Sequence, residues 1–248
     1  MNDLESWQYI AIGLMFVWGG TVRSGLGFGG AALTLPLLLL IVDNPVIFLP
    51  IIGIQLVIFG LVTIGVRPTH VDYAYLARSL VIILPFKFVG VFGLLSLPAN
   101  VLTAMVYAIT LFYAIGYLTG IQIQSRSRIS DSILLAAGGY VSGTSLIGAP
   151  LIIAVYVKYV ARENLRETLF VLWIILVVIK LAAFVGTGTN LQLVHQLWLF
   201  PCALIGHLLG LRPHHHLQQA RPETFMRVIG LALLVITVIG ITVNFIVA

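Results

Sequence analysis

Four basic side chains stand in stretches of sequence that are otherwise apolar, namely Arg23, Lys87, Lys180 and His207. A Lys or Arg at the centre of a bilayer costs about 2.5 to 3.5 kcal/mol even on lenient insertion scales, so such residues usually line a pathway and have a partner. Every Asp and Glu falls in a predicted loop or at a predicted helix end. We therefore expect the partner of these cations to be a bound anion.

Three of these four cations also have a structural alternative. Lys180 lies about six residues from the end of its predicted helix, where its side chain is able to snorkel to the membrane surface. Arg23 is an interfacial arginine if its segment enters the membrane only partway. His207 is a proton-coupling candidate, because histidine titrates near neutral pH, or else a hydrogen-bonded histidine of the core.

Two segments rich in glycine and hydroxyl residues, 23–30 and 141–150, resemble each other and stand at corresponding places in the two halves of the chain. Glycine lets the backbone approach a ligand closely, and a helix that begins at such a break presents unpaired N–H groups to an anion. The expected substrate-binding residues of the first segment are Arg23, Ser24, Gly25, Gly27, Gly29 and Gly30. Those of the second segment, together with the two lysines, are Ser142, Gly143, Thr144, Ser145, Gly148, Pro150, Lys87 and Lys180. The alternative role of these glycines is close packing of helices.

The composition is that of a membrane protein. Of 248 residues, 60% are hydrophobic and only 8% are charged, whereas soluble domains carry roughly 25% charged residues. We expect an all-α polytopic membrane protein with a single domain over residues 1–248. The N-terminal residues 1–7 contain no Lys or Arg, so we expect the first hydrophobic segment to be retained.

Several other classes of protein do not fit this composition. The basic residues are scattered over short loops rather than gathered on one face, which argues against nucleic acid as a partner. The single cysteine, Cys202, rules out an intrachain disulfide. The three histidines at 214–216 follow Arg212 and Pro213, and we interpret them as a solvated loop. No metal site and no cofactor are expected.

The elements that must position the candidate residues are hydrophobic segments, and they repeat. In the first half they are expected at residues 7–22, 30–42, 45–66, 73–96 and 98–120, and in the second at 132–143, 148–160, 165–186, 195–211 and 223–246. The second segment of each half is shorter than the 17 or so residues that span a bilayer, which suggests half-helices or re-entrant hairpins. We thus expect two repeats, about 1–124 and 125–248, each a hairpin followed by three crossings.

The placement of Lys and Arg predicts the orientation of each repeat in the membrane. The joints around residues 43–44, 97–99 and 187–192 have no Lys or Arg, whereas the other joints carry several. Cytoplasmic loops are enriched in these residues. With an odd number of crossings in each repeat, the two repeats enter the membrane from opposite sides. The sequence therefore predicts inverted-topology repeats, with both termini outside the cytoplasm.

The two glycine-rich hairpins, the sequence His70-Val71-Asp72-Tyr73 and the run from residue 206 to 240 resemble the sulfite exporter TauE/SafE family, also called TSUP. The resemblance implies a bacterial or archaeal plasma-membrane carrier for sulfite, thiosulfate, sulfoacetate or other sulfonates, most often an exporter. Members commonly have a fuller glycine triplet in the hairpins. Here the matching positions read Gly29-Gly30-Ala31 and Ile147-Gly148-Ala149, which leaves the substrate of this chain open.

Our leading interpretation is a secondary transporter that binds a small sulfur-containing anion at the two hairpin tips and moves it by alternating access. An inside-negative potential of about 100 mV drives each negative charge outward by about 2.3 kcal/mol, which favours export. The partners are then a small anion and membrane lipid, with a homo-oligomer possible. An anion channel or an accessory membrane subunit is the first alternative. An intramembrane serine protease that pairs Ser142 with His207 is the second.

Overall fold

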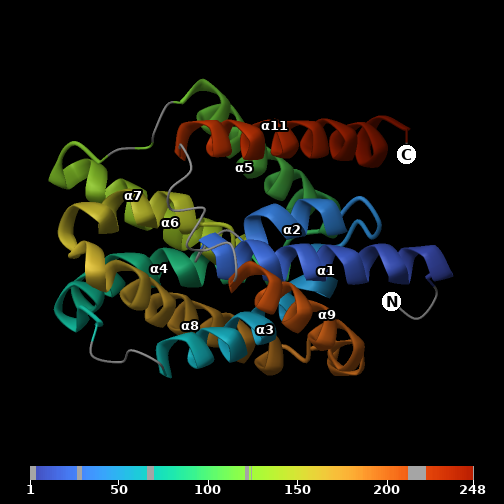
Figure 1. The fold of residues 1–248 in the computed structure, drawn as a ribbon, viewed down its shortest axis with the longest axis horizontal. Coiled ribbons are helices and arrows are strands. Elements are labelled where there is room, and N and C mark those ends of the chain that lie inside the picture. Colours follow the sequence, from blue (N-terminus) through green and yellow to red (C-terminus); the bar gives the residue numbers. More distant parts are fainter. Residues whose placement is uncertain are drawn as a thin grey trace. The chain divides into compact units, whose positions relative to one another are not determined.

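The computed structural model describes residues 4–26, 30–65, 70–120, 123, 125–211 and 222–247. Within those residues the chain is all-helical, with ten α-helices, a terminal π-helical segment and no strand (Figure 1). The fold class expected from the composition is therefore confirmed. The helices form two compact units, which we describe separately.

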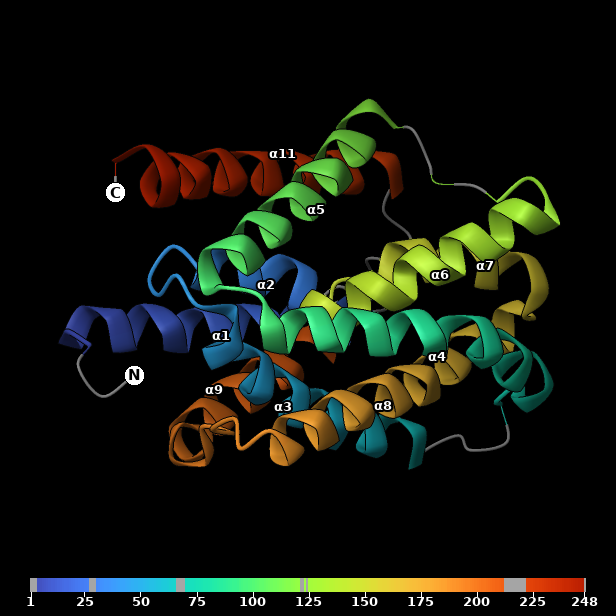
Figure 2. The same cartoon turned by 180° about the vertical axis from the view of Figure 1, so that it is seen from behind.

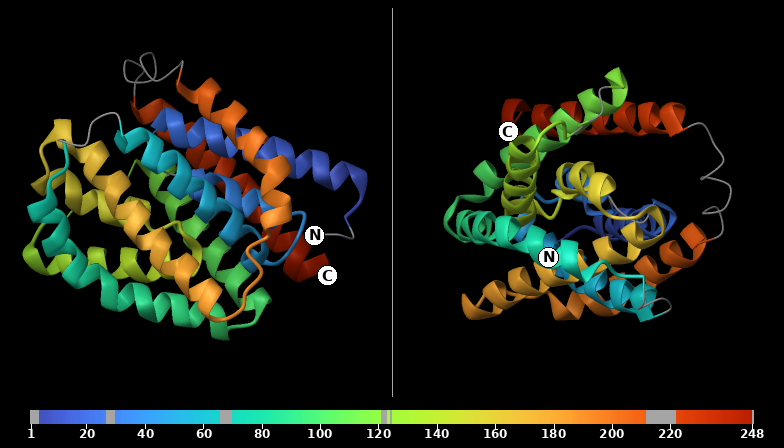
Figure 3. Two further views of the ribbon diagram at one scale, coloured as in Figure 1. Left: turned by 90° about the horizontal axis from the view of Figure 1, so that it is seen from below. Right: turned by 90° about the vertical axis from the view of Figure 1, so that its left-hand side faces the viewer.

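Unit 1 is made of residues 1–48, 98–122 and 192–248. Its helices are α1 (Ser6–Leu26), α2 (Gly30–Leu38), α5 (Ala99–Thr119), α9 (Leu193–Leu211) and α11 (Pro222–Ile241), followed by a π-helix at Thr242–Val247. Side chains of α1, α2, α5 and α11 share a small apolar core, formed by Val22, Leu33, Ala114, Ile229 and Leu233. Figure 3 shows α11 in red next to α5 in green in its right-hand view.

Unit 2 is made of residues 49–97 and 123–191. It contains most of α3 (Pro45–Gly65), with α4 (Tyr73–Ser96), α6 (Arg128–Ser145), α7 (Ala149–Tyr159) and α8 (Arg162–Gly186). An apolar core in this unit joins residues of α4, α6, α7 and α8. Figure 2 shows α4 beside α6 and α8.

The helix bounds agree closely with the predicted segments. The two short segments are short helices of 9 and 11 residues, α2 and α7. Among the described residues, six helices are long and apolar enough to cross a membrane, three in each half of the chain: α3, α4, α5, α8, α9 and α11. The chain is thus a multi-pass membrane protein. Its orientation, including the sides on which the termini lie, stays a prediction.

The compact units do not follow the halves of the chain. Each unit holds one short-helix hairpin, α1–α2 or α6–α7, and packs it against helices from both halves. In unit 1 the first hairpin lies along α9, and in unit 2 the second hairpin lies along α4. The halves at about 1–124 and 125–248, with their inverted orientation, stay predictions from the sequence.

The starts of the short helices α2 and α7 nevertheless make a similar contact. A Cβ added at Gly30 would lie 3.1 Å from the carbonyl oxygen of Gly19. A Cβ added at Gly148 would overlap the carbonyl oxygen of Gly138. In both hairpins, therefore, the start of the short helix crosses a glycine of the long helix at backbone contact. The duplication expected from the sequence stays a prediction.

Glycines also set the spacing of the long helices within each unit. In unit 1, a Cβ at Gly206 or Gly20 would overlap backbone of the partner helix, because α1 and α9 touch through main-chain atoms there. In unit 2, α4 and α6 touch in the same way at Gly90 and Gly143. Small residues that allow backbones to approach are typical of helix interfaces in membranes.

Candidate anion-binding site

Lys87 lies on the buried face of α4. The buried residues of this helix recur every three or four positions, from Leu76 through Ile83 and Lys87 to Leu94, so the helical period carries Lys87 inward. Its side chain is 0% exposed. Nζ donates to the carbonyl oxygen of Ser142 at 2.8 Å and to its Oγ at 3.1 Å.

The contact with Ser142 is partly structural. Ser142 lies in the last turn of α6, where its carbonyl oxygen also accepts from the N–H of Leu146 at 3.3 Å, and a lysine near a helix C-terminus is a common additional cap. An ammonium has three N–H donors, of which Ser142 takes two. Lys87 therefore both caps the broken end of α6 and has one donor left.

Lys180 is also buried, but it has no contact like that between Lys87 and Ser142. It lies on the inner face of α8 with Trp173, Leu176, Val177 and Phe184, and its side chain is 1% exposed. Its Nζ is buried and makes no hydrogen bond to any residue that the structure describes. The alternative of snorkelling to the membrane surface is therefore wrong for this conformation.

The two lysines lie on contacting helices of unit 2. Helices α4 and α8 share an apolar core that includes Ile83, one turn before Lys87, and Leu176, one turn before Lys180. Moving an ammonium from water to a protein interior costs several kcal/mol unless a counter-charge and hydrogen bonds offset it. Neither the contact with Ser142 nor any other described contact brings a carboxylate to this pair. The arrangement therefore suits a bound anion.

The break between α6 and α7 lies next to this pair. Leu146 ends α6 in the left-handed region with φ 61°, Gly148 precedes α7, and Pro150 occupies its first turn. Ile147 in the break is 0% exposed. Non-helical backbone at membrane depth is tolerated only where protein buries it or where it lines a water-filled cavity. The break expected from the sequence is thus present, and it is enclosed by the protein.

The hydroxyl groups of the second hairpin are already engaged. Thr144 Oγ1 and Ser145 Oγ donate to the carbonyl oxygen of Val141 at 3.1 and 3.0 Å. Ser142 Oγ accepts from Lys87. Each Ser or Thr has only one O–H donor, so Thr144 and Ser145 must rotate before they donate to an anion. In this conformation the ammonium groups are the available donors.

The glycines of the second hairpin serve packing in this structure. A Cβ at Gly143 would lie 2.6 Å from the carbonyl oxygen of Lys87, and Gly148 meets Gly138. This is the alternative role that the sequence left open. Close approach of a substrate to the same glycines stays a prediction.

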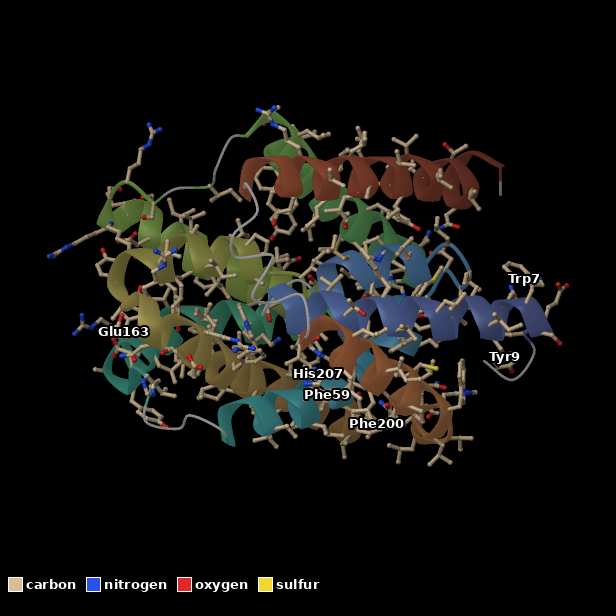
Figure 4. The ribbon with its side chains drawn as sticks, in the orientation of Figure 1. Trp7, Tyr9, Phe59, Glu163, Phe200 and His207 are labelled. Atoms are coloured by element: carbon tan, nitrogen blue, oxygen red, sulfur yellow. The ribbon has the colours of Figure 1, made fainter. Side chains whose placement is uncertain are left out.

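In unit 1 the first hairpin holds a second basic group. Arg23 lies in the last turn of α1, and its Nε and Nη2 atoms are buried. Its neighbour Ser24 shares its hydroxyl between the carbonyl oxygens of Gly20 and His207, at 2.8 and 2.9 Å. Ser24 thus joins α1 to α9 rather than offering a free donor. His207 is partly buried on α9, where Figure 4 labels it together with Phe200.

Some predictions fall outside what the structure tests. Gly27 and Gly29 lie outside the described residues, as do the histidines at 214–216. Gly25 lies in α1 and Gly30 begins α2. Arg23 and Lys87 belong to different units, so a single site shared by both hairpin tips stays a prediction.

Sequence reasoning missed an ionic cluster at the open end of the second hairpin. The Asp131 carboxylate accepts from Lys158 Nζ at 3.2 Å, from Tyr159 Oη at 2.5 Å and from Ser125. Burial raises the pKa of Asp131, but these hydrogen bonds outweigh it and hold the pKa below the ordinary value of 3.8. The sequence did contain a signal for this cluster, because Asp131 and Lys158 have opposite charges and stand at the two ends of the second predicted hairpin.

The described residues contain no group of three or more His, Cys, Asp or Glu side chains placed to hold a metal ion. In comparisons with known proteins, no curated protein and no solved structure matches the chain. A family model does match, that of the sulfite exporter TauE/SafE, over residues 11–241. This match covers the two hairpins, both buried lysines and all six long apolar helices. The chain therefore belongs to the sulfite exporter TauE/SafE family.

Proposed function

We propose that this protein is a secondary carrier that exports small sulfur-containing anions, such as sulfite, thiosulfate or an organosulfonate, across the plasma membrane. Family membership implies a membrane transporter for sulfur anions such as sulfite. The observation that carries the assignment to residues is the buried pair Lys87 and Lys180, in which the Lys180 ammonium lacks a described hydrogen-bond partner.

The chemistry of the pair fits an oxyanion. Each ammonium is a compact charge with three donors, and hydrogen bonds between charged groups are roughly twice as strong as neutral ones. The substrate oxygens would take the free donors of Lys180 and the remaining donor of Lys87. Alternating access would then open this enclosed site to each side of the membrane in turn.

The other basic residues have subsidiary roles in this proposal. Arg23, in the last turn of α1, would contribute positive charge along the substrate path at the first hairpin. His207 would carry a proton if transport is coupled to one. Export of an anion down the membrane potential needs no coupled ion, so this role is needed only for uptake.

The enzyme alternative is less well supported. Ser142 and His207 belong to different units, and Ser142 Oγ accepts its hydrogen bond from Lys87. A Ser–Lys pair is a known nucleophile and base, but Ser142 is only 4% exposed and stands beside Gly143, where α4 and α6 are in backbone contact. A serine-directed fluorophosphonate probe that labels the wild type at Ser142 would support the enzyme and count against the carrier.

A transport screen tests the proposal directly. Purified protein in liposomes would be supplied with labelled sulfite, thiosulfate, sulfate or a short sulfonate, each over a range of concentrations. We expect saturable transport of at least one sulfur anion, and a strong reduction in Lys180→Gln. Flux that rises linearly with concentration would indicate a channel, and no flux of any of the anions would count against transport of this substrate class.

A further inference from the structure

We propose that the Lys87–Lys180 pair makes the site selective for doubly charged sulfur oxyanions over singly charged ones. This inference rests on the proposed function, because it concerns the charge of the anion that the same site binds. It goes further by assigning that selectivity to two named residues.

Two buried lysines give the site its charge. Both ammonium groups are buried, at 0% and 1% exposure, in one compact unit. The acidic residues on the same helices are distant. Glu167 precedes Lys180 on α8, and Asp72 caps the start of α4, so about 20 Å of helix separates each carboxylate from the lysine on its own helix.

The helix ends at the break add little net charge to the site. The C-terminus of a helix carries about −0.5 of an elementary charge and the N-terminus about +0.5. The break at residues 146–148 brings the end of α6 and the start of α7 to the same place. These partial charges have opposite signs and nearly cancel. When both lysines are protonated, the site therefore presents about two positive charges to its ligand.

The charge of the ligand decides how much of the positive charge of the two ammonium groups is compensated. A dianion neutralises both ammonium groups, and its oxygens take the unused donors of Lys180 and Lys87. A monoanion of the same shape leaves one buried positive charge without compensation, which is costly in a low-dielectric interior. The preference is thus set by Lys180, because Lys87 retains its contacts with Ser142 in either case.

Two ligands of nearly the same shape separate charge from size. Thiosulfate is a dianion with a sulfur atom attached to an SO3 group, and methanesulfonate is a monoanion with a methyl group in that place. Affinities for both would be measured by calorimetry on the purified wild-type protein near neutral pH, in a buffer of large inert ions. We expect the wild type to bind thiosulfate about 10- to 100-fold more tightly, the effect of one charged hydrogen-bonded contact.

The variant Lys180→Met keeps an unbranched side chain, one atom shorter, and removes its charge. We expect it to weaken thiosulfate binding by about 10- to 100-fold while methanesulfonate affinity changes by less than about threefold, so that the preference disappears. Lys180→Gln is a second variant, in case the first does not fold. The matched control is Arg128→Gln, which removes a positive charge from an exposed position in the same unit and should leave the preference unchanged.

The outcomes separate the two proposals. Equal affinity of the wild type for both ligands would overturn the charge selectivity while leaving the carrier function intact. An undiminished preference in Lys180→Met or Lys180→Gln would overturn the role of Lys180. Binding of neither ligand, together with no transport of any sulfur anion, would overturn the proposed function itself.

Discussion

The packing of α4 against α6 predicts opposite effects on stability for alanine substitutions at two glycines of α4. A Cβ at Gly90 would overlap the carbonyl oxygen of Tyr140 and lie 2.9 Å from the Cα of Gly143. Carbon atoms in favourable contact are about 3.5 to 4.0 Å apart, so the two helices must separate by up to about 1 Å to accept Gly90→Ala. A Cβ at Gly93, three residues further along, meets only Leu97 Cδ1 at 3.8 Å.

The magnitudes follow from these contacts. Overpacking of this kind typically costs about 1 to 3 kcal/mol, which we expect Gly90→Ala to lose. Gly93→Ala should instead gain about 0.5 to 1 kcal/mol, because alanine is the better helix former and its methyl group has room. The free energies of unfolding of the two variants should thus differ by about 1.5 to 4 kcal/mol, or roughly 3 to 16 °C in Tm.

Thermal unfolding of both variants in the same detergent measures this difference, with the wild type between them. The reasoning also requires Gly90→Ala to disturb the Lys87–Ser142 contact, since Lys87 is on the same face of α4. Its affinity for thiosulfate should therefore fall with its stability. Equal melting temperatures for the two variants would show that α4 and α6 are not in backbone contact at Gly90.

Four further predictions concern other parts of the chain. In a Cys202→Ala background, cysteines at Ser127 and Thr187 should react with impermeant thiol reagents from opposite sides of the membrane, Ser127 from the cytoplasm; reaction of both from one side would refute the predicted topology. Gly148→Ala should lower Tm because its Cβ overlaps the carbonyl oxygen of Gly138, whereas Gly186→Ala, with nothing within 4 Å, should not, as melting curves would show. Because the folded pKa of Asp131 is below 3.8, the cluster stabilises the protein above that pH and loses this contribution as the pH falls through the folded value, so the Tm advantage of wild type over Asp131→Asn should shrink below about pH 4. Arg23→Gln should weaken substrate binding by about 1.5 to 3 kcal/mol if Arg23 contacts the anion, and unchanged affinity in calorimetry would exclude that contact.

The positions of the helices were predictable from the sequence because apolar length and glycine breaks decide them. The segment expected at 73–96 is α4 at Tyr73–Ser96, and the two short segments are the short helices α2 and α7. The burial of Lys87 was also within reach. It shares the helical period of the apolar residues around it, so one face of α4 carries them all inward.

Which helices pack together was not predictable in the same way. Periodicity gives the face of a helix that is buried but not the partner that buries it. The sequence grouped each hairpin with the three helices that follow it, whereas each compact unit draws helices from both halves. This grouping depends on contacts between residues far apart in the sequence, such as Gly206 against the backbone of Val17.

The state of the individual polar groups was the least predictable part of the site. Ser24 and Thr144 have the right reach to bind an anion, yet their hydroxyls bond to carbonyl groups of their own helices and neighbours. Lys180 stands near enough to a helix end to snorkel, yet it is buried. Which groups a polar side chain contacts depends on distances on the scale of an ångström, and these distances cannot be read from the sequence.

The central claim is that a sulfur anion is carried by way of the buried lysine pair, and counterflow tests it most directly. Liposomes containing the protein would be loaded with unlabelled thiosulfate and diluted into a trace of labelled thiosulfate. A carrier predicts a transient accumulation of label above equilibrium in the wild type, preserved in Arg128→Gln and abolished in Lys180→Met. Accumulation in Lys180→Met equal to that of the wild type, or simple equilibration without overshoot in the wild type, would contradict the claim.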